Sequence, residues 1–338
     1  MALAPRSLEK RPSKGVALKA LVVRFSAIGD CVMSVPVASA IRRKYPQGSI
    51  VWAVEPRCSP VIDTEILVSE LSLFARDDWQ SRRWSPRCWR DQLRTYLNLR
   101  KHDFDIGIDL QGQAKTALCL RLARPKKRIA VKSHDVLSAR LNPILDVDRG
   151  GMHVVEHGML GLSKLGDFPT DIEFVMPRLE SEMKHVGEML SRQKPLVTIS
   201  VSAGGLKKVY PLPMWEEVAK RLAEDGMDVA FLGGPGDPIS GQPGTIDLVG
   251  KLTLRQSMAA IRLSAVHLAA DTGSGHIAAA YGVPVVSVFG RTPPSAFRPY
   301  TKKGIVLDGE GSPTNVQPGQ IVDALRAVRE RHSETISH

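Results

Sequence analysis

The sequence predicts an α/β protein made of two doubly wound domains in series, each with its own parallel sheet. The chain has 338 residues, about twice the usual size of one domain. Short β-branched apolar runs alternate with longer amphipathic stretches, as they do where helices cover both faces of a parallel sheet. The pattern begins again near residue 195, after a charged and irregular stretch, and this restart indicates a second sheet.

The expected elements follow one another along the whole chain. Strands are expected at residues 20–25, 50–54, 104–110, 128–132, 196–202, 228–233, 265–270, 284–290 and 305–309, and helices at 33–45, 113–123, 153–165, 214–225, 255–263 and 318–331. They predict a basic tail (1–17), a Rossmann-like domain (18–170), a connector (171–194) and a second Rossmann-like domain (195–338). Ligands of such sheets bind beyond the carboxyl ends of the strands, so we expect a site in a cleft between the two domains.

Composition excludes several classes of protein. With 43% hydrophobic and 24% charged residues, the chain has enough apolar material for two cores and is not a disordered sequence. It contains no run of 18 apolar residues, and its basic N-terminal stretch lacks the features of a signal peptide. The four cysteines (Cys31, Cys58, Cys88 and Cys119) form no CxxC pair. Reduced thiols and a cytoplasmic location are therefore expected.

The excess of positive charge lies entirely in the first half. Residues 1–170 contain 28 Lys and Arg against 17 Asp and Glu, whereas residues 171–338 contain 18 of each. The basic residues gather at 76–101, where tryptophans lie among them, and at 121–132. A one-sided basic domain usually faces an anionic partner such as nucleic acid, a phosphorylated lipid or a membrane surface. Solvated helix faces are the alternative.

The first expected strand leads into a candidate catalytic carboxylate. Phe25 is followed by a turn of small residues that ends at Gly29, and Asp30 comes next, at the carboxyl end of the strand. A carboxylate beside a cleft can accept a proton from a bound hydroxyl group. The alternative is a helix N-cap, a position that Asp often occupies. The spacing leaves both roles open.

Three loops in the second half have the composition of a nucleotide site. Asp271 to Gly275 form a small-residue turn before an alanine-rich helix that His276 opens, and helix amides next to glycines suit a diphosphate. The loop after the strand at 196–202 offers glycines with Lys207 and Lys208, which can neutralise phosphate charge. A third strand ends in a glycine-rich loop at Asp237, a residue able to bind ribose hydroxyls. Taken alone, the Asp271 loop is also compatible with an ordinary capped turn, and the lysine loop with solvated surface lysines.

In this order the motifs resemble glycosyltransferase family 9, the heptosyltransferases that add heptose to the inner core of lipopolysaccharide. The likeness covers roughly residues 18–310. It is carried by R-F-S-A-I-G-D (24–30), D-L-Q-G-Q-A-K-T (109–116), G-G-P-G-D (233–237), L-V-G-K-L-T-L (248–254) and, most specifically, the segment from Asp271 to Gly290.

The resemblance implies a GT-B fold, two Rossmann-like domains facing across a cleft. It implies inverting transfer of heptose from ADP-L-glycero-D-manno-heptose to the 3-deoxy-D-manno-octulosonic acid (Kdo) and heptose inner core, with Asp30 as the base. The implied donor-binding residues are Ala203, Gly204, Lys208, Asp237, Asp271, Thr272, Gly273 and His276, and the implied acceptor-binding residues are Arg24, Ser26, Gln111 and Lys115. No metal is expected, because Lys208 and the helix amides can take the diphosphate charge.

The family also implies a phosphorylated, Kdo-bearing lipid A acceptor and a peripheral place on the cytoplasmic face of the inner membrane. A monomer that binds no nucleic acid is expected. Three segments depart from the family pattern: Val201-Ser202-Ala203 replaces P-G-A, Lys208-Val209-Tyr210-Pro211 replaces K-x-W-P, and Arg291-Thr292 replaces P-T. Because of these departures, a donor that carries another activated sugar is an open alternative.

Other readings of the sequence stay open. A basic nucleic-acid-binding protein would explain the charge of the first half but would leave the Asp271–Gly290 loop unused. An epimerase would need a second acid or base that the sequence does not reveal. His153 to His157 match the five-residue zinc pattern H-x-x-E-H, and Asp103 to Asp105 resemble a metal-binding D-x-D. No second motif supports either metal site, and the D-x-D precedes a strand start, away from the expected cleft.

Overall fold

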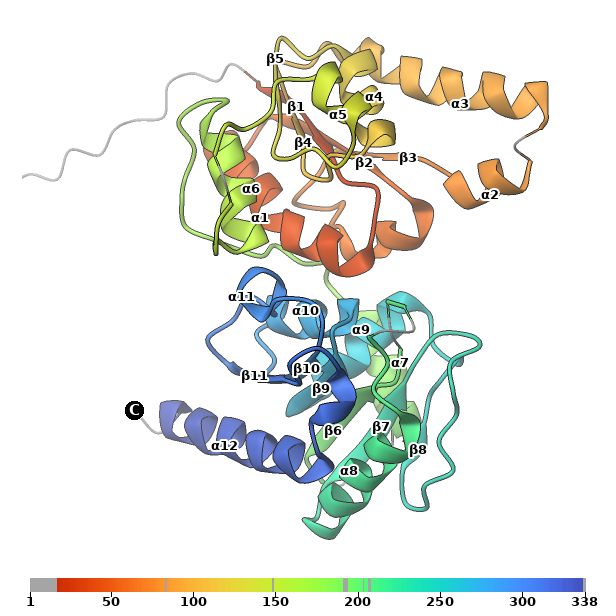
Figure 1. The fold of residues 1–338 in the computed structure, drawn as a ribbon, viewed down its shortest axis with the longest axis vertical. Coiled ribbons are helices and arrows are strands. Elements are labelled where there is room, and N and C mark those ends of the chain that lie inside the picture. The colour runs from red at the N-terminus through yellow and green to blue at the C-terminus, as the bar shows by residue number, and fades with distance from the viewer. Residues whose placement is uncertain are drawn as a thin grey trace, which may run out of the picture.

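The computed structural model describes residues 17–82, 84–147, 149–190, 194–202, 204–205 and 208–336. Of the expected tail, only Ala17 falls within these residues. The chain forms two α/β halves stacked along the long axis of the molecule, with the N-terminal half above the C-terminal half in Figure 1.

The first half contains a five-stranded parallel sheet in the order β3-β2-β1-β4-β5. Its strands are β1 (Lys19–Val23), β2 (Ser49–Val54), β3 (Glu70–Leu73), β4 (Ile106–Asp109) and β5 (Lys127–Ala130). Its helices are α1 (Ile28–Lys44), η1 (Pro56–Val61), α2 (Arg76–Ser81), α3 (Pro86–Asn98), η2 (Leu99–His102), α4 (Ala114–Ala123), α5 (Val136–Leu141) and α6 (Val154–Ser163). Alternate residues of β1 pack on opposite faces, Ala20 and Val22 among α1 residues and Leu21 and Val23 among α3 and α4 residues.

The second half contains a six-stranded parallel sheet in the order β11-β10-β9-β6-β7-β8. Its strands are β6 (Leu196–Ser200), β7 (Asp228–Leu232), β8 (Ile246–Asp247), β9 (Val266–Ala270), β10 (Val285–Phe289) and β11 (Gly304–Asp308). Its helices are α7 (Glu180–Leu190), α8 (Leu212–Glu224), α9 (Leu254–Leu263), α10 (Gly273–Ala280), α11 (Pro294–Phe297), η4 (Pro313–Asn315) and α12 (Pro318–Ile336). In both sheets the strand order reverses beside the first strand of the half, which is where α/β sheets bind ligands.

The two halves pack against each other through helices, on the side where the carboxyl ends of the strands face each other. Residues of α1 pack against residues of α10, and α11 lies close to α6 (Figure 1). At the second of these places His153 Nε2 donates to the Arg298 carbonyl oxygen at 2.8 Å, and the Tyr300 hydroxyl donates to Glu156 Oε1 at 3.0 Å. The strand-end loops of both sheets therefore open toward the boundary between the halves.

Most of the expected elements are present, and the differences are local. Each expected strand corresponds to an observed one, whereas the edge strands β3 and β8 were not predicted, because they are short and half-exposed and so carry little apolar signal. Helix α1 begins at Ile28 rather than at residue 33, and α10 begins at Gly273 rather than at His276. In both places a glycine predicts a loop before the helix. In the structure that glycine already belongs to the first turn of the helix. Within the described chain, no helix combines the length and hydropathy that a membrane span needs.

Candidate active site

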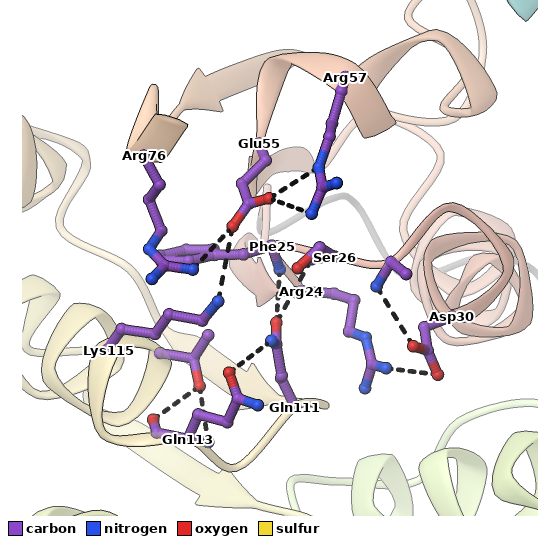
Figure 2. Close-up of polar contacts among 12 residues, drawn as sticks. Arg24, Phe25, Ser26, Asp30, Glu55, Arg57, Arg76, Gln111, Gln113 and Lys115 are labelled. Atoms are coloured by element: carbon purple, nitrogen blue, oxygen red, sulfur yellow. Dashed lines mark hydrogen bonds and ion pairs between the residues drawn. The ribbon is translucent and has the colours of Figure 1, made fainter. Parts of the chain in front are cut away.

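Asp30 lies in the first turn of α1 and forms an ion pair with Arg24, which directly follows β1. Arg24 Nη2 and Asp30 Oδ1 are 2.5 Å apart, and Arg24 Nη1 donates to the Leu110 carbonyl oxygen at 2.6 Å (Figure 2 shows the ion pair). The arginine side chain is 8% exposed and the aspartate side chain 33% exposed. A buried cation thus holds a carboxylate that reaches the surface of the site.

Asp30 also supports the start of its own helix. Ala27, not Asp30, is the N-cap residue of α1, and its amide donates to Asp30 Oδ2 at 3.2 Å. Burial by itself raises the pKa of Asp30, but the Arg24 guanidinium and the Ala27 amide outweigh it and hold the pKa below its ordinary value. The carboxylate is therefore ionised at neutral pH and able to accept a proton.

Gln111, an expected acceptor-binding residue, has its side chain engaged by the backbone. Its Oε1 accepts from the Phe25 amide at 2.9 Å and from the Ser26 amide at 3.4 Å, and its Nε2 donates to Gln113 Oε1 at 2.9 Å. One oxygen of the buried Asp109, at the end of β4, accepts from the Gln111 amide at 2.9 Å. These contacts fix the loop after β1, and with it Ser26, against the loop after β4.

Lys115, also expected to bind the acceptor, belongs to a charged cluster around Glu55. Glu55 is 3% exposed, and its Oε1 lies 3.5 Å from Lys115 Nζ and 3.1 Å from an Arg76 nitrogen, while its Oε2 lies 3.1 Å from an Arg57 nitrogen (Figure 2). Burial raises the pKa of Glu55, yet Arg76, Lys115 and Arg57 together hold it below its ordinary value. Three cations share one carboxylate, so this corner of the site has net positive charge.

In the second half, Lys208 and Asp271 form the ion pair at the corresponding place. Lys208 belongs to the loop after β6, Asp271 follows the neighbouring strand β9, and Lys208 Nζ lies 2.6 Å from Asp271 Oδ2. Here the carboxylate side chain is only 9% exposed, while the lysine side chain is 37% exposed. The buried carboxylate of Asp271 thus holds the ammonium group of Lys208 at the surface, which is where a phosphate-binding lysine must lie.

The loop after β9 presents the start of α10 to the boundary between the halves. Thr272 is the N-cap residue, and its Oγ1 lies 3.0 Å from Ser274 Oγ. His276 is buried, and burial lowers its pKa to about 4 against the opposing effect of Asp30 and Asp271. Its imidazole is therefore neutral at physiological pH. Amides in the first turn of a helix can bind an anion, which is the role expected of this loop.

Asp237, an expected donor-binding residue, has its carboxylate engaged within its own loop. Asp237 Oδ2 accepts from Ser202 Oγ at 2.5 Å and from the Gly234 amide at 2.7 Å, so its carboxylate closes its own glycine-rich loop. Like Lys208, Asp271 and His276, it is not one of the described residues that line the adjoining cavity. Gly204 does line that cavity, and Ala203 lies outside the described residues.

A cavity of about 480 Å³ lies between the halves and brings these loops together. Residues 27–29 and Arg57 line it from the first half, and residues 233–235 and 272–274 line it from the second. The contact is tight, because a Cβ added at Gly29 would lie 2.6 Å from His276 Cδ2 and 3.0 Å from the Gly273 Cα. The helix that carries Asp30 therefore touches the helix that carries the expected donor loop.

The sequence did not reveal every residue that lines the cavity. Leu252, Leu254 and Ile261 form an apolar wall that suits a flat aromatic ring such as a nucleobase. The first two belong to L-V-G-K-L-T-L, a motif noted in the sequence without a role. Glu55, which pairs with Arg57, carried no motif signal, because its other partners Arg76 and Lys115 lie 21 and 60 residues away in the chain.

Comparison with known proteins identifies the family of this chain. The family model described as glycosyltransferase family 9 (heptosyltransferase) matches residues 93–318, about two thirds of the chain. The chain belongs to glycosyltransferase family 9. It is therefore a glycosyltransferase, as its motifs predicted. Lipopolysaccharide heptosyltransferase 1 of Pseudomonas aeruginosa is 25% identical over 313 residues, which cover 87% of this family 9 chain and 84% of that protein.

Solved structures confirm the fold. A family 9 glycosyl transferase from Veillonella parvula matches with a TM-score of 0.81 at 19% identity, over 94% of this chain and 99% of the other. The Escherichia coli heptosyltransferase WaaC with ADP matches with a TM-score of 0.77 at 19% identity, over 92% of this chain and all of the other. The family 9 chain thus has the GT-B fold that its sequence predicted, with two Rossmann-like domains facing across a cleft.

The two metal-like patterns of the sequence have structural partners of their own. His153 Nδ1 accepts from the Val155 amide at 3.2 Å, so both of its ring nitrogens are engaged within the protein. Asp105 accepts from the Lys19 amide and from Lys126, each at 2.9 Å, at the end of the sheet away from the cavity. Among the residues that the structure describes, no group of three His, Cys, Asp or Glu side chains is arranged to hold a metal ion.

Proposed function

We propose that this family 9 enzyme transfers heptose from ADP-heptose to the Kdo and heptose inner core of lipopolysaccharide, with inversion at the anomeric carbon. The observation that carries the proposal is the contact of Gly29 with Gly273 and His276, because it brings Asp30 to the expected donor loop. Relatives support the choice of sugar and nucleotide, since those matched across the chain are lipopolysaccharide heptosyltransferases and one solved neighbour holds ADP.

In this mechanism Asp30 accepts the proton of the acceptor hydroxyl. The hydroxyl oxygen forms a bond to the anomeric carbon from the face opposite the diphosphate, the bond from that carbon to the phosphate oxygen breaks, and ADP leaves. Lys208 and the amides of residues 272–274 stabilise the charge that develops on the diphosphate. The apolar wall at Leu252 and Leu254 receives the adenine ring.

The donor and the acceptor would approach from different halves. The donor residues belong to the second half, which is electrically balanced, and the acceptor residues belong to the basic first half. A phosphorylated, Kdo-bearing lipid A carries the complementary negative charge. Arg24 and Gln111 serve this binding indirectly, since the first positions Asp30 and the second fixes the loop at Ser26.

An assay of several nucleotide-activated sugars against truncated Kdo-lipid A acceptors, with product masses as readout, tests the proposed function. We expect product from ADP-heptose and at least about tenfold lower kcat/KM with ADP-glucose or UDP-sugars. If the enzyme prefers another activated sugar, that sugar and not heptose is the substrate. A rise in melting temperature with short RNA, and none with ADP, would support nucleic-acid binding instead.

We further propose that helix α3 holds the enzyme on an anionic membrane surface. Trp89 is 62% and Leu93 53% exposed on this helix, next to the exposed Arg87, Arg90 and Arg94. An amphipathic helix with aromatic and basic residues on its open side binds anionic lipid. Trp79, from the same basic cluster, is instead buried against Phe74 and Tyr96.

Co-sedimentation with vesicles of phosphatidylglycerol and phosphatidylethanolamine tests this surface. We expect Trp89→Ser with Leu93→Ser to lower the bound fraction several-fold, because less apolar area enters the interface. The matched control is Met189→Ser with Ile239→Ser, two exposed apolar residues of the second half. Equal binding by both double variants would contradict a role for α3.

A further inference from the structure

A second, smaller cavity lies beside Asp30, which is one of its lining residues. Every described residue that lines it belongs to the first half, from α1, α6, the segment before α6 and the loops that follow β1, β4 and β5. Arg24, Asp30, Lys132 and Arg149 are its charged lining residues. Its volume is about 30 Å³, which is room for a small group but not for a sugar ring.

The order of the strands explains why these cations converge. Arg24 follows β1 and Lys132 follows β5, and these strands flank β4 in the parallel sheet, so their carboxyl ends lie at one edge. Gly112, in the loop after β4, has a φ of 72°, and a Cβ there would lie 2.2 Å from the Lys132 carbonyl oxygen. The loop after β4 therefore packs directly on Lys132 and holds it beside the cavity.

Positive charge at this cavity exceeds negative charge. The negative charge of Asp30 is balanced by the positive charge of Arg24. Lys132 makes no hydrogen bond or ion pair with any residue that the structure describes, and the contact shown for Arg149 is with the Phe297 ring, 4.9 Å away. Burial, together with the nearby Arg24 and Arg149, lowers the pKa of Lys132 to about 8 against the opposing effect of Asp30 and Asp109. An oxyanion in the cavity would supply the missing counter-charge.

We propose that Lys132 and Arg149 form a subsite that binds an oxyanion, a carboxylate or phosphate of the acceptor sugar, beside Asp30. The inference rests on the proposed glycosyl transfer and adds to it the residues that select an acidic acceptor. The size of the cavity admits one small charged group and leaves the sugar ring outside, next to Asp30. Anchoring the ring at one point fixes the direction of its hydroxyl toward the base.

Kinetics with matched variants test the subsite. We expect Lys132→Met, which keeps the apolar stem, to raise the KM for Kdo-lipid A at least about tenfold, with the affinity for ADP unchanged within about twofold. Arg149→Gln should act in the same direction. The controls are Lys127→Met and Arg140→Gln, because both side chains are exposed on β5 and α5, away from the cavity. An acceptor KM unchanged in Lys132→Met overturns the proposal.

Modified acceptors identify the source of the oxyanion. If the carboxylate is bound, its methyl ester lowers kcat/KM for the unmodified enzyme, and Lys132→Met adds no further loss with the ester. If a phosphate is bound, the dephosphorylated acceptor gives that pattern instead. Equal losses in Lys132→Met with acidic and neutral acceptors would contradict the subsite, because the lysine would then act only on structure.

Chemical protection of Lys132 gives a readout that needs no turnover. A lysine with a lowered pKa reacts readily with an acetylating ester at pH 8, and peptide masses report its modification. We expect the methyl glycoside of Kdo or inorganic phosphate to protect Lys132 but not Lys127. If the enzyme transfers no sugar and Lys132 is still protected, the proposed function fails and the subsite stands. If transfer occurs and neither anion protects Lys132, the subsite fails alone.

Discussion

The two halves of the molecule carry ion pairs that are nearly equal in length and opposite in orientation. Arg24 and Asp30 are 2.5 Å apart, and Lys208 and Asp271 are 2.6 Å apart. Each pair lies where the strand order of its sheet reverses. In the first half the cation is buried and the carboxylate reaches the site, whereas in the second half the carboxylate is buried and the cation reaches it.

In the proposed mechanism this inversion lets one fold, used twice, supply two kinds of chemistry. A carboxylate supported from behind by arginine stays ionised and accepts a proton, which suits attack by a hydroxyl group. A lysine supported from behind by aspartate stays in place and neutralises a phosphate, which suits a leaving group. Changes to the two pairs should therefore have different kinetic consequences.

The largest effect is expected from Asp30→Asn. Loss of the base should lower kcat about 10³-fold, while the dissociation constant for ADP changes by less than about twofold. Single-turnover transfer and ADP titration measure the two quantities. The matched control is Asp167→Asn, an aspartate whose side chain is fully exposed. Equal loss of transfer and ADP binding would contradict the assignment of Asp30 as the base.

Lys208→Ala should affect binding of the donor instead. We expect the dissociation constant for ADP to rise at least about tenfold, or about 1.4 kcal/mol, because the lysine no longer faces the diphosphate. Titration calorimetry measures this, with the exposed Lys220→Ala as its control. Unchanged ADP affinity would remove Lys208 from the donor site and direct attention to Lys207, which lies outside the described residues.

Gly29→Ala tests the contact between the halves. The new Cβ would lie 2.6 Å from His276 Cδ2 and 3.0 Å from the Gly273 Cα, so we expect strain of about 1–3 kcal/mol and a fall in kcat of about tenfold. Gly187→Ala in α7 is the control, since a Cβ there meets no atom within 4 Å. If both variants retain full activity, close approach of α1 and α10 is not needed for transfer.

Arg24→Gln should produce the smallest change at neutral pH and a clear one in acid. Burial alone raises the pKa of Asp30 and Arg24 opposes it, so removal of the guanidinium raises that pKa. Below the raised pKa the base is protonated, and the acid limb of the kcat/KM profile moves to higher pH. Arg24→Lys, which retains a positive charge, should move it less. An unshifted acid limb in Arg24→Gln would show that Arg24 does not tune Asp30.

The sequence predicted the parallel strands, the GT-B fold and the place of Asp30 and of the Asp271–His276 turn, because local apolar patterns and motifs encode them. It did not predict the edge strands, which carry few apolar residues. The early starts of α1 and α10 were missed because Gly29 and Gly273 are typical of turns, and both glycines lie where the two helices approach closely.

Electrostatic partners were the least accessible to prediction. The association of Glu55 with Arg76 and Lys115 joins segments 21 and 60 residues apart, and no local pattern records it. Lys132 and Arg149 meet at one cavity only because β5 lies next to β4 and α6 returns beside α1. The resemblance assigned Arg24 and Gln111 to the acceptor, which stays a prediction, and no local pattern revealed that their side chains contact Asp30 and the loop after β1.

A crystal structure with a donor analogue that cannot be transferred tests the central claim most directly. The diphosphate should lie within hydrogen-bond distance, about 3 Å, of Lys208 Nζ and of amides in residues 272–274. The anomeric carbon should then face Asp30 across a gap wide enough for one hydroxyl group. A diphosphate bound elsewhere, or an anomeric carbon turned away from Asp30, would contradict the account.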